Sequence, residues 1–276
     1  MNYTEFINAV KEEVKEHLEP DIIVELHTAM KNNGTIRKGL MIGRRGVNVS
    51  PAIYLEEFYE QYLKGKSISL LAETIQQIYE QVKVQNSYSC DNIFSYEKVK
   101  EKIVYKLIQR EANENLLGEV PYEEFLDLAL VFYVLLEATP FGNATLLVKN
   151  EHLGEWGVSK EEIMKAAEKN TPKLLPLRFE KLANFMYVMT NQPQNLGACT
   201  VCYPEACKKA RETIGENFYV IPSSIHEMIL IPESYGLNRL QLEIMAGEIN
   251  SEDVEEEEVL SGNVYYYSGK EGRLIL

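Results

Sequence analysis

The chain has 276 residues, enough to bury a substantial core, and its 45% hydrophobic and 25% charged residues are ordinary values for a globular protein. A formal net charge of −14 argues against general affinity for nucleic acids or anionic membranes, because both would repel the chain. No stretch approaches the roughly 18 apolar residues that a membrane-spanning helix needs, and the charged N-terminus lacks the apolar segment of a signal peptide. We therefore expect a cytoplasmic protein.

The N-terminal part of the chain opens with a clear helix signal. Asn2 can cap a helix together with Glu5, and apolar residues then recur at helical spacing until Pro20 ends the pattern. Beyond this helix, the patterns predict a strand over residues 21–30, an Asn-Asn-Gly turn at 32–34, one or two strands over 36–49, a helix that restarts at Ser50-Pro51 and ends at Gly65, and an amphipathic helix over 71–82.

The C-terminal part mixes apolar runs with further helix signals. Ser159 and Glu162 form a capping box that opens a helix, and this helix is expected to stop before Pro172. Residues 99–110 fit either a strand or a helix. We further predict strands over 128–136, 144–148, 218–221 and 228–231, a helix over 204–214, a helix over 237–246 with Leu237, Leu240 and Ile244 on one face, and a final hairpin over 264–267 and 273–276.

The grouping of these elements indicates the fold class. Strands cluster and so do helices, which favours an α+β fold with a mixed or antiparallel sheet and packed helices over a regular βαβ alternation. The polar stretch around residues 86–96 is the best candidate for a boundary between two sub-domains. We predict one domain over residues 1–276 with that internal boundary.

The most chemically varied stretch is the polar corner 222–227 between two short apolar runs, which are typical of strands buried on both faces. Ser223, Ser224, His226 and Glu227 are therefore candidates for contacting a ligand or a partner. A serine and the histidine could also form a nucleophile and its base. Their spacing argues against this, because residues three apart on a strand–turn–strand rarely face each other, and no G-x-S-x-G elbow accompanies them. Serines at turns more often bond their own backbone.

Charge is distributed unevenly along the chain. Residues 26–55 contain no acid, whereas six acids occupy the seven positions 252–258. The acidic run is most simply a solvated loop or helix face. The basic stretch could hold an acidic partner, a phosphate or the chain's own acidic loop, or its charges could be solvated or paired internally. Its candidate binding residues are Lys38, Arg44 and Arg45, beside Lys31 and Arg37.

Three cysteines, Cys199, Cys202 and Cys207, form a C-x2-C-x4-C pattern. C-x2-C is the usual half of a zinc site, but the second half is missing, because Cys90 is the only other cysteine and no C-x2-C or H-x3-H pattern accompanies it. The apolar neighbours suit buried free thiols. We keep the three cysteines as candidate metal ligands and predict no cofactor.

Several blocks of the sequence resemble the DUF5688 family of gut Firmicutes, and they run over nearly the whole chain in family order. They are NNGTIRKGLMIGRRGVNVSPAIYLEEFYEQYLKG, EVPYEEFLDLALVFYVLL, WGVSKEEIMKAAEKNTPKLLP, FYVIPSSIHEMILIPE and VLSGNVYYYS. Three shorter blocks, W-G-V-S-x-E-E, N-T-P and V-I-P-S-S-I-H-E, are also distantly similar to the DUF1444 family. The resemblance implies a small cytoplasmic bacterial protein without an assigned activity. Neither family supplies catalytic residues, so the shared positions are only candidates: Asn48, Pro51, Asn170, Pro172, Ser223 and His226.

The leading functional hypothesis is a non-enzymatic binding protein that contacts a protein or a small molecule through the 31–45 hairpin or the 222–227 corner. The alternative is a hydrolase centred on Ser223, Ser224 and His226. A third hypothesis is a zinc-stabilised module built on the three clustered cysteines. General nucleic-acid binding and membrane binding are not expected.

Overall fold

The computed structural model describes residues 1–44, 50–82, 95–139, 142–183, 185–252 and 254–276. The chain divides into two units by its internal contacts. Every strand pair whose register is described is antiparallel, so the fold is α+β with antiparallel sheets. The predicted boundary at 86–96 falls mostly outside the described residues. The first unit comprises Met1–Lys31, Thr35–Ile93 and Thr139–Gly142, and the second comprises Asn32–Gly34, Phe94–Ala138 and Asn143–Leu276.

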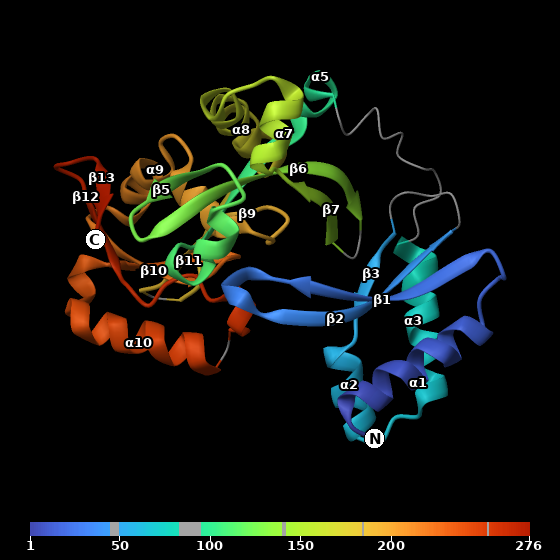
Figure 1. The fold of residues 1–276 in the computed structure, drawn as a ribbon. Helices are drawn as coiled ribbons and strands as arrows, with labels where there is room; N and C mark the ends of the chain where they lie inside the picture. The colour runs from blue at the N-terminus through green and yellow to red at the C-terminus, as the bar shows by residue number, and fades with distance from the viewer. Residues whose placement is uncertain (45–49, 83–94, 140–141, 184, 253) are drawn as a thin grey trace. The chain divides into compact units, whose positions relative to one another are not determined.

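The first unit is a three-stranded sheet, in the order β1-β2-β3, with helices beside it (Figure 1). Phe6 and Val14 of the first helix are buried in one cluster with Val24 and Leu40 of the sheet, so the predicted helical stripe is the face that packs. The predicted capping box at Asn2 is present. The elements are α1 (Tyr3–Glu16), β1 (Ile22–Met30), β2 (Ile36–Arg44), β3 (Ala52–Tyr54), α2 (Glu56–Leu63) and α3 (Ile68–Val82).

The second unit contains two sheets. The larger has the strand order β13-β12-β10-β11-β9-β8, and in the smaller β6 pairs with β4, β5 and β7. Its strands are β4 (Ile103–Gln109), β5 (Tyr122–Phe125), β6 (Leu128–Thr139), β7 (Gly142–Leu147), β8 (Leu177–Lys181), β9 (Tyr187–Asn191), β10 (Phe218–Ser224), β11 (Glu227–Pro232), β12 (Tyr265–Ser268) and β13 (Arg273–Ile275). Its helices are α5 (Tyr96–Val99), α6 (Glu114–Leu117), α7 (Asn150–Trp156), α8 (Lys160–Leu174), α9 (Ala206–Ile214) and α10 (Arg239–Glu252), with 3-10 turns η1 (Asn32–Gly34), η2 (Lys100–Lys102), η3 (Glu111–Asn113), η4 (Gly197–Cys202), η5 (Glu233–Tyr235) and η6 (Glu256–Glu258).

The main core of the second unit lies between its sheets and includes side chains of α8, α9 and η4. The β10–β11 hairpin is central to it. Val220 and Leu230 belong to this core, whereas Ile221 and Ile231 belong to a second cluster under α10. Both faces of the hairpin are therefore buried, as the two apolar runs predict.

The predicted helix start at Ser50-Pro51 is wrong, because the chain first adds a strand to the sheet. The N–H of Ile42 donates to the Pro51 carbonyl at 3.1 Å, and the N–H of Leu55 donates to the Lys38 carbonyl at 2.9 Å. These bonds hold the intervening residues as β3, and α2 begins only at Glu56. Pairing with β2 overrides the local helix signal.

The predicted end of α8 before Pro172 is also wrong, since the helix continues to Leu174. A proline removes one backbone donor from a helix. Here its neighbour Thr171 is buried and donates its hydroxyl to the Ala167 carbonyl at 2.6 Å. The same hydroxyl accepts the N–H of Tyr105 in β4 at 3.2 Å, so packing against the sheet holds the last turn.

The predicted buried face of the last helix is wrong as well. Leu240 and Ile244 are 65% and 56% exposed, whereas α10 buries Leu242 and Ala246. The helix also runs past Gly247. Its apolar residues are spread around the helix axis, so their spacing alone does not identify the packed face.

Candidate functional site

The polar corner predicted as a site is shorter in the structure than in the sequence pattern. The β10–β11 register shifts between Ile221 and Ser224, as at a β-bulge. Ser223 and Ser224 consequently belong to the end of β10 and are buried. Glu227 opens β11 directly opposite Ser224. The turn itself holds only two residues, and one of them is the histidine.

The imidazole of His226 is held on both sides. The backbone N–H of Leu196 donates to Nδ1 at 3.1 Å, and Nε2 lies 3.0 Å from Oε1 of Glu258. Because Nδ1 accepts a hydrogen bond, the ring proton is on Nε2 and is donated to the carboxylate. The backbone is fastened too, since Thr190 Oγ1 donates to the His226 carbonyl at 2.7 Å and the His226 N–H donates to Ser224 Oγ at 3.0 Å. Neither ring nitrogen is left for a reacting group.

This geometry does not form the serine–histidine pair of a hydrolase. A nucleophilic serine must donate its proton to an imidazole nitrogen, but both nitrogens of His226 are engaged by Leu196 and Glu258, and the Ser224 hydroxyl contacts the backbone N–H of His226. Gly197 packs tightly against the same turn. A β-carbon on Gly197 would lie 2.6 Å from the His226 carbonyl oxygen and 2.7 Å from the Asn191 nitrogen, so only glycine fits. We call this set of contacts around His226 and Gly197 the joint.

Part of the acidic run belongs to this joint. Besides the side-chain bond to His226, the Glu258 carbonyl accepts the N–H of Ile225 at 2.9 Å. The amide of Asn33 in η1 donates to the carbonyls of Glu256 and Val259, at 2.8 Å each. The loop is thus held by backbone and side-chain bonds, and Glu258 is more than a solvated charge.

A second polar network was not predicted from the sequence. Asp127, between β5 and β6, accepts hydrogen bonds from Ser261 at 2.6 Å, Asn263 at 2.9 Å and the hydroxyl of Tyr265 at 2.5 Å. Burial acts to raise the pKa of Asp127, but these three donors outweigh it and hold the pKa below its usual value. In the sequence, these donors could have been suspected from the polar residues inside the otherwise apolar block VLSGNVYYYS.

The three cysteines are not arranged as metal ligands. Cys199 donates its thiol to the Leu196 carbonyl at 3.3 Å, and Cys207 donates to the Val201 carbonyl at 3.6 Å. Burial raises the pKa of the Cys199 thiol to about 12 and raises the pKa of Cys202 as well, whereas a metal binds the thiolate. Among the described residues, no group of three histidine, cysteine or acidic side chains is placed to hold a metal ion.

The Asn-Thr-Pro block in α8 also has a structural role. Asn170 is buried, and its amide donates to the carbonyls of Lys100 at 2.7 Å and Ile103 at 3.1 Å. With the neighbouring Thr171, it joins α8 to the start of β4. Asn170 therefore helps to fix the packing of a helix on a sheet.

Most basic residues described in the β1–β2 hairpin have partners: Arg37 pairs with Glu57, and the ammonium group of Lys31 lies 4.1 Å from the centre of the Tyr54 ring. Arg44 forms ion pairs with Glu19 at 2.8 Å and with Asp21 at 2.9 Å. Its charge is thus compensated within the first unit, although exposed pairs of this kind add little stability. Lys38 lies exposed on β2. Two further candidates, Arg45 and Asn48, lie outside the described residues.

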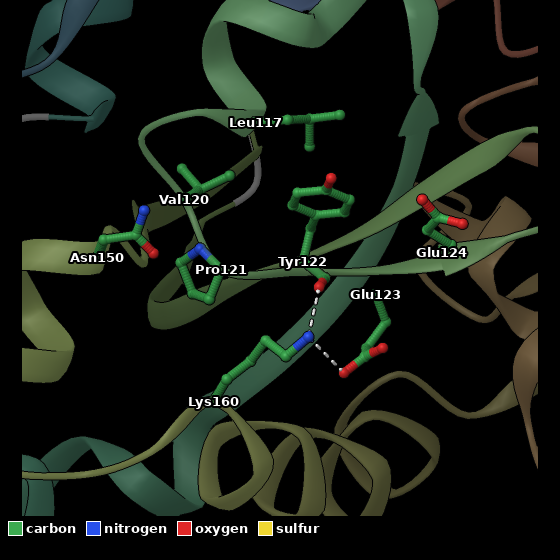
Figure 2. A pocket seen from close by; sticks show the side chains of 8 residues that line it. All are labelled: Leu117, Val120, Pro121, Tyr122, Glu123, Glu124, Asn150 and Lys160. Carbon is green, nitrogen blue, oxygen red and sulfur yellow. Dashed lines mark hydrogen bonds and ion pairs between the residues drawn. The ribbon is translucent and has the colours of Figure 1, made fainter.

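An open pocket of about 430 Å³ lies at the start of β5 in the second unit (Figure 2). Lys160 reaches into it from the start of α8. Its ammonium group donates to the Tyr122 carbonyl at 3.2 Å and pairs with Glu123 at 3.0 Å. The charge of the lysine is therefore already compensated within the pocket wall. No residue proposed from the sequence lines this pocket; its walls are Leu117, Val120, Pro121, Tyr122, Glu123, Glu124, Asn150 and Lys160.

The fold is α+β, and the polar residues of the 222–227 corner form hydrogen bonds within the second unit. The chain belongs to DUF5688, a family of unknown function, whose model matches residues 3–186 and 183–269. Neither a curated protein nor a solved structure matches the chain. Among the described helices, none combines the length and the apolarity that crossing a bilayer requires.

Proposed function

We propose that the protein is a non-catalytic binding protein that holds a protein partner on one face of the β1–β2 hairpin. The main evidence for this proposal is the exposure of apolar side chains along the hairpin. Leu26 is 47% exposed, Met30 is 70% exposed and Ile36 is 58% exposed. Met30 and Ile36 lie directly opposite each other in the register. A patch of exposed apolar side chains on a folded protein is typical of a protein-binding site.

The strand geometry places these side chains on one surface. Successive residues of a strand point to opposite faces, and cross-strand partners share a face. The face that carries the exposed residues also carries Val24, which is buried among the residues of the first unit's core. That core therefore covers only the half of this face that carries Val24 and Ile42. We name the uncovered half the distal hairpin face; it consists of Leu26, Thr28, Met30, Ile36 and Lys38.

The chemistry of this surface indicates the kind of partner. Lys38 lies opposite Thr28 and beside the apolar pair Met30 and Ile36. Residues 26–55 contain no acid, and the nearby carboxylate of Glu56 accepts the backbone N–H of Lys38 at 2.7 Å. A protein surface that offers apolar side chains next to an acidic group would fit best.

The hydrolase alternative has less support, because both nitrogens of the His226 imidazole are engaged. A structural role makes a distinct prediction for His226→Ala. We expect a loss of about 2 kcal/mol in the free energy of unfolding, because the Leu196 N–H and the Glu258 carboxylate lose their common partner. Partner binding should persist. Hydrolysis of an ester or amide substrate that disappears in a folded His226→Ala protein would contradict the proposal.

We also propose that the protein acts in the cytoplasm of a bacterium, as its composition and family resemblance imply. Cys199, Cys202 and Cys207 are free thiols. Free thiols persist in reducing compartments, which supports this location. Fractionation of the native host with an antibody against the chain would test it.

The binding function is tested with the full chain as bait in an extract of the native host. The variant Ile36→Asp/Lys38→Glu changes the distal hairpin face without touching the main core, and Leu240→Asp is the matched control at an equally exposed residue of α10. We expect the wild type and the control to retain the same partner and the hairpin variant to lose it, at equal thermal stability. Retention by all three proteins would contradict the proposed surface.

A further inference from the structure

Strand β1 is the outer strand of the first unit's sheet, and no described strand pairs with its outer edge. The N–H of Lys31 donates to the Thr35 carbonyl at 2.7 Å, which sets the alternation of the β1–β2 ladder. Odd-numbered residues of β1 therefore bond β2, and even-numbered residues direct their N–H and C=O groups outward. The outward groups belong to Val24, Leu26, Thr28 and Met30.

Within the part of the chain that the structure describes, the sequence and length of β1 give this edge little protection against pairing with another chain. Natural edge strands are short, bulged, or interrupted by proline or lysine. In contrast, β1 pairs with β2 over nine consecutive residues without a register shift. Its sequence, IIVELHTAM, holds no proline and no lysine, and Glu25 is its only acid. An unprotected edge of this length is suited to accepting a further strand.

We infer that the strand that pairs with this edge is β1 of a second copy of the chain, antiparallel and related by a twofold axis at Leu26. Apolar residues occupy both ends of β1, and the polar residues Glu25 and His27 lie on either side of Leu26. In this register the nine residues of the two strands lie opposite each other, and the N–H of Ile22, which donates to the Glu19 carbonyl at 2.9 Å, stays outside the new ladder. The pairs are Ile22 with Met30, Ile23 with Ala29, Val24 with Thr28, Glu25 with His27, and Leu26 with its own copy.

The pair formed by Glu25 and His27 lies where side chains of neighbouring strands are closest. Because the even-numbered residues exchange hydrogen bonds, Glu25 and His27 of the second copy form a non-hydrogen-bonded pair, in which side chains approach most closely. Glu25 is exposed and His27 is half-buried on the open face of the sheet. The twofold axis creates this carboxylate–imidazole pair twice. Because an imidazole N–H can donate a hydrogen bond to a carboxylate, this pairing favours a second copy as the occupant.

The neighbouring registers are less favourable. An axis at Glu25 sets two carboxylates opposite each other, and like charges at facing positions destabilise a sheet. An axis at Val24 or Thr28 leaves part of the nine-residue strand unpaired. The register centred on Leu26 is the one that combines full overlap with two carboxylate–imidazole pairs.

The dimer would join two three-stranded sheets into one six-stranded sheet, in the order β3-β2-β1-β1-β2-β3. The twofold axis is perpendicular to this sheet, so the two distal hairpin faces lie on the same side. This inference goes beyond the proposed function, because it uses the backbone edge of β1 and holds whether or not a further partner binds. Two copies of the face on one rigid sheet would allow bivalent binding.

Cross-linking tests the register directly. In chains with Cys90→Ser, Leu26→Cys places two thiols across the axis with Cα atoms roughly 5.5 Å apart, within disulfide range. Thr28→Cys is the matched control on the same edge, because its two copies lie four residues out of register, roughly 13 Å apart. Under mild oxidation we expect Leu26→Cys to form a covalent dimer and Thr28→Cys to stay at the level of the parent. Equal or absent cross-linking in both variants would overturn the register.

Association is measured separately, by sedimentation equilibrium of the full chain at increasing concentration. We expect a species of twice 31.7 kDa. Glu25→Lys should weaken dimerisation roughly tenfold by changing two cross-strand pairs, and Glu25→Lys/His27→Glu should restore it. The variant Ile36→Asp/Lys38→Glu should dimerise normally even if it loses its partner, which separates this inference from the proposed function. A wild-type monomer at every concentration, or unchanged affinity in Glu25→Lys, would overturn it.

Discussion

The β10–β11 corner and the β1–β2 hairpin are both antiparallel strand pairs, but they differ in what their polar and apolar groups do. In the corner, both nitrogens of His226, its backbone and the Ser224 hydroxyl are engaged by other parts of the second unit. In the hairpin, Met30 and Ile36 are exposed, and one strand edge has no described partner. A dense set of reactive residue types can therefore be structural, whereas a plain apolar strand can be available for binding.

This difference has a measurable consequence. Substitutions in the polar networks of the second unit should act on the free energy of unfolding, because they leave buried groups without partners. Substitutions on the hairpin should act on association and leave stability nearly unchanged.

The largest effect is expected at Asp127. Replacing it by Ala removes the acceptor of three hydrogen bonds and leaves the buried hydroxyls of Ser261 and Tyr265 without the acceptor to which they donate. We expect a loss of about 3 kcal/mol in the free energy of unfolding, measured by urea denaturation. The matched control is Glu124→Ala, which removes an exposed carboxylate of the neighbouring β5 and should cost less than about 0.5 kcal/mol. Equal effects of the two substitutions would show that the hydrogen bonds of Asp127 do not stabilise the fold.

The same carboxylate predicts how stability depends on pH. The pKa of Asp127 is lower in the folded protein than its ordinary value of 3.8, so the unfolded chain binds the proton more readily. Its contribution is complete above pH 3.8 and is lost as the pH falls through the lower folded pKa. Urea unfolding at pH 5 and pH 3 should show a smaller acid loss in Asp127→Asn than in the wild type. An identical loss in both proteins would contradict the assignment.

A smaller loss is expected at Gly197. Its substitution by Ala would press a β-carbon against the carbonyl of His226 and the backbone of Asn191, and neither can move without disturbing β9 or the turn. We expect a loss of about 2 kcal/mol in thermal or urea unfolding. Gly262→Ala is the control, because a β-carbon there meets no atom within 4 Å. If both substitutions were tolerated equally, the joint would be looser than its hydrogen bonds indicate.

The smallest stability effect is expected on the hairpin. Ile36→Asp removes an apolar side chain that is already 58% exposed, so the free energy of unfolding should change by less than about 0.5 kcal/mol. Partner capture by the same protein should nevertheless fall. A loss of several kcal/mol would show that this residue is part of the core, and the contrast between the two hairpins would disappear.

Local patterns predicted much of the secondary structure. The capping boxes at Asn2 and Ser159 are both present, and the apolar run from Leu128 forms the long strand β6. These signals depend on residues a few positions apart. Where local signals were mixed, as over residues 99–110, contact with β6 decided for the strand β4.

The parts that could not be predicted depend on contacts between distant residues. Asp127 meets Ser261 across 134 positions, and Glu258 meets His226 across 32. No local pattern reports such a pair. The sequence did single out the residues of the 222–227 corner, but their spacing could not show that both imidazole nitrogens would already be occupied. The predicted buried face of α10 was wrong for a related reason. Which leucine is buried, Leu242 or Leu240, depends on the residues that pack against the helix and not on its own sequence.

The reactivity of the buried thiols in the second unit can be used to measure local opening of the fold. Alkylating reagents attack the thiolate, and burial raises the pKa of Cys199 to about 12 while shielding the sulfur from solvent. Modification at neutral pH therefore requires a transient opening around η4, which also carries Gly197 beside the corner. The rate at which an intact chain loses its Cys199 thiol would count these openings, without any label or substitution.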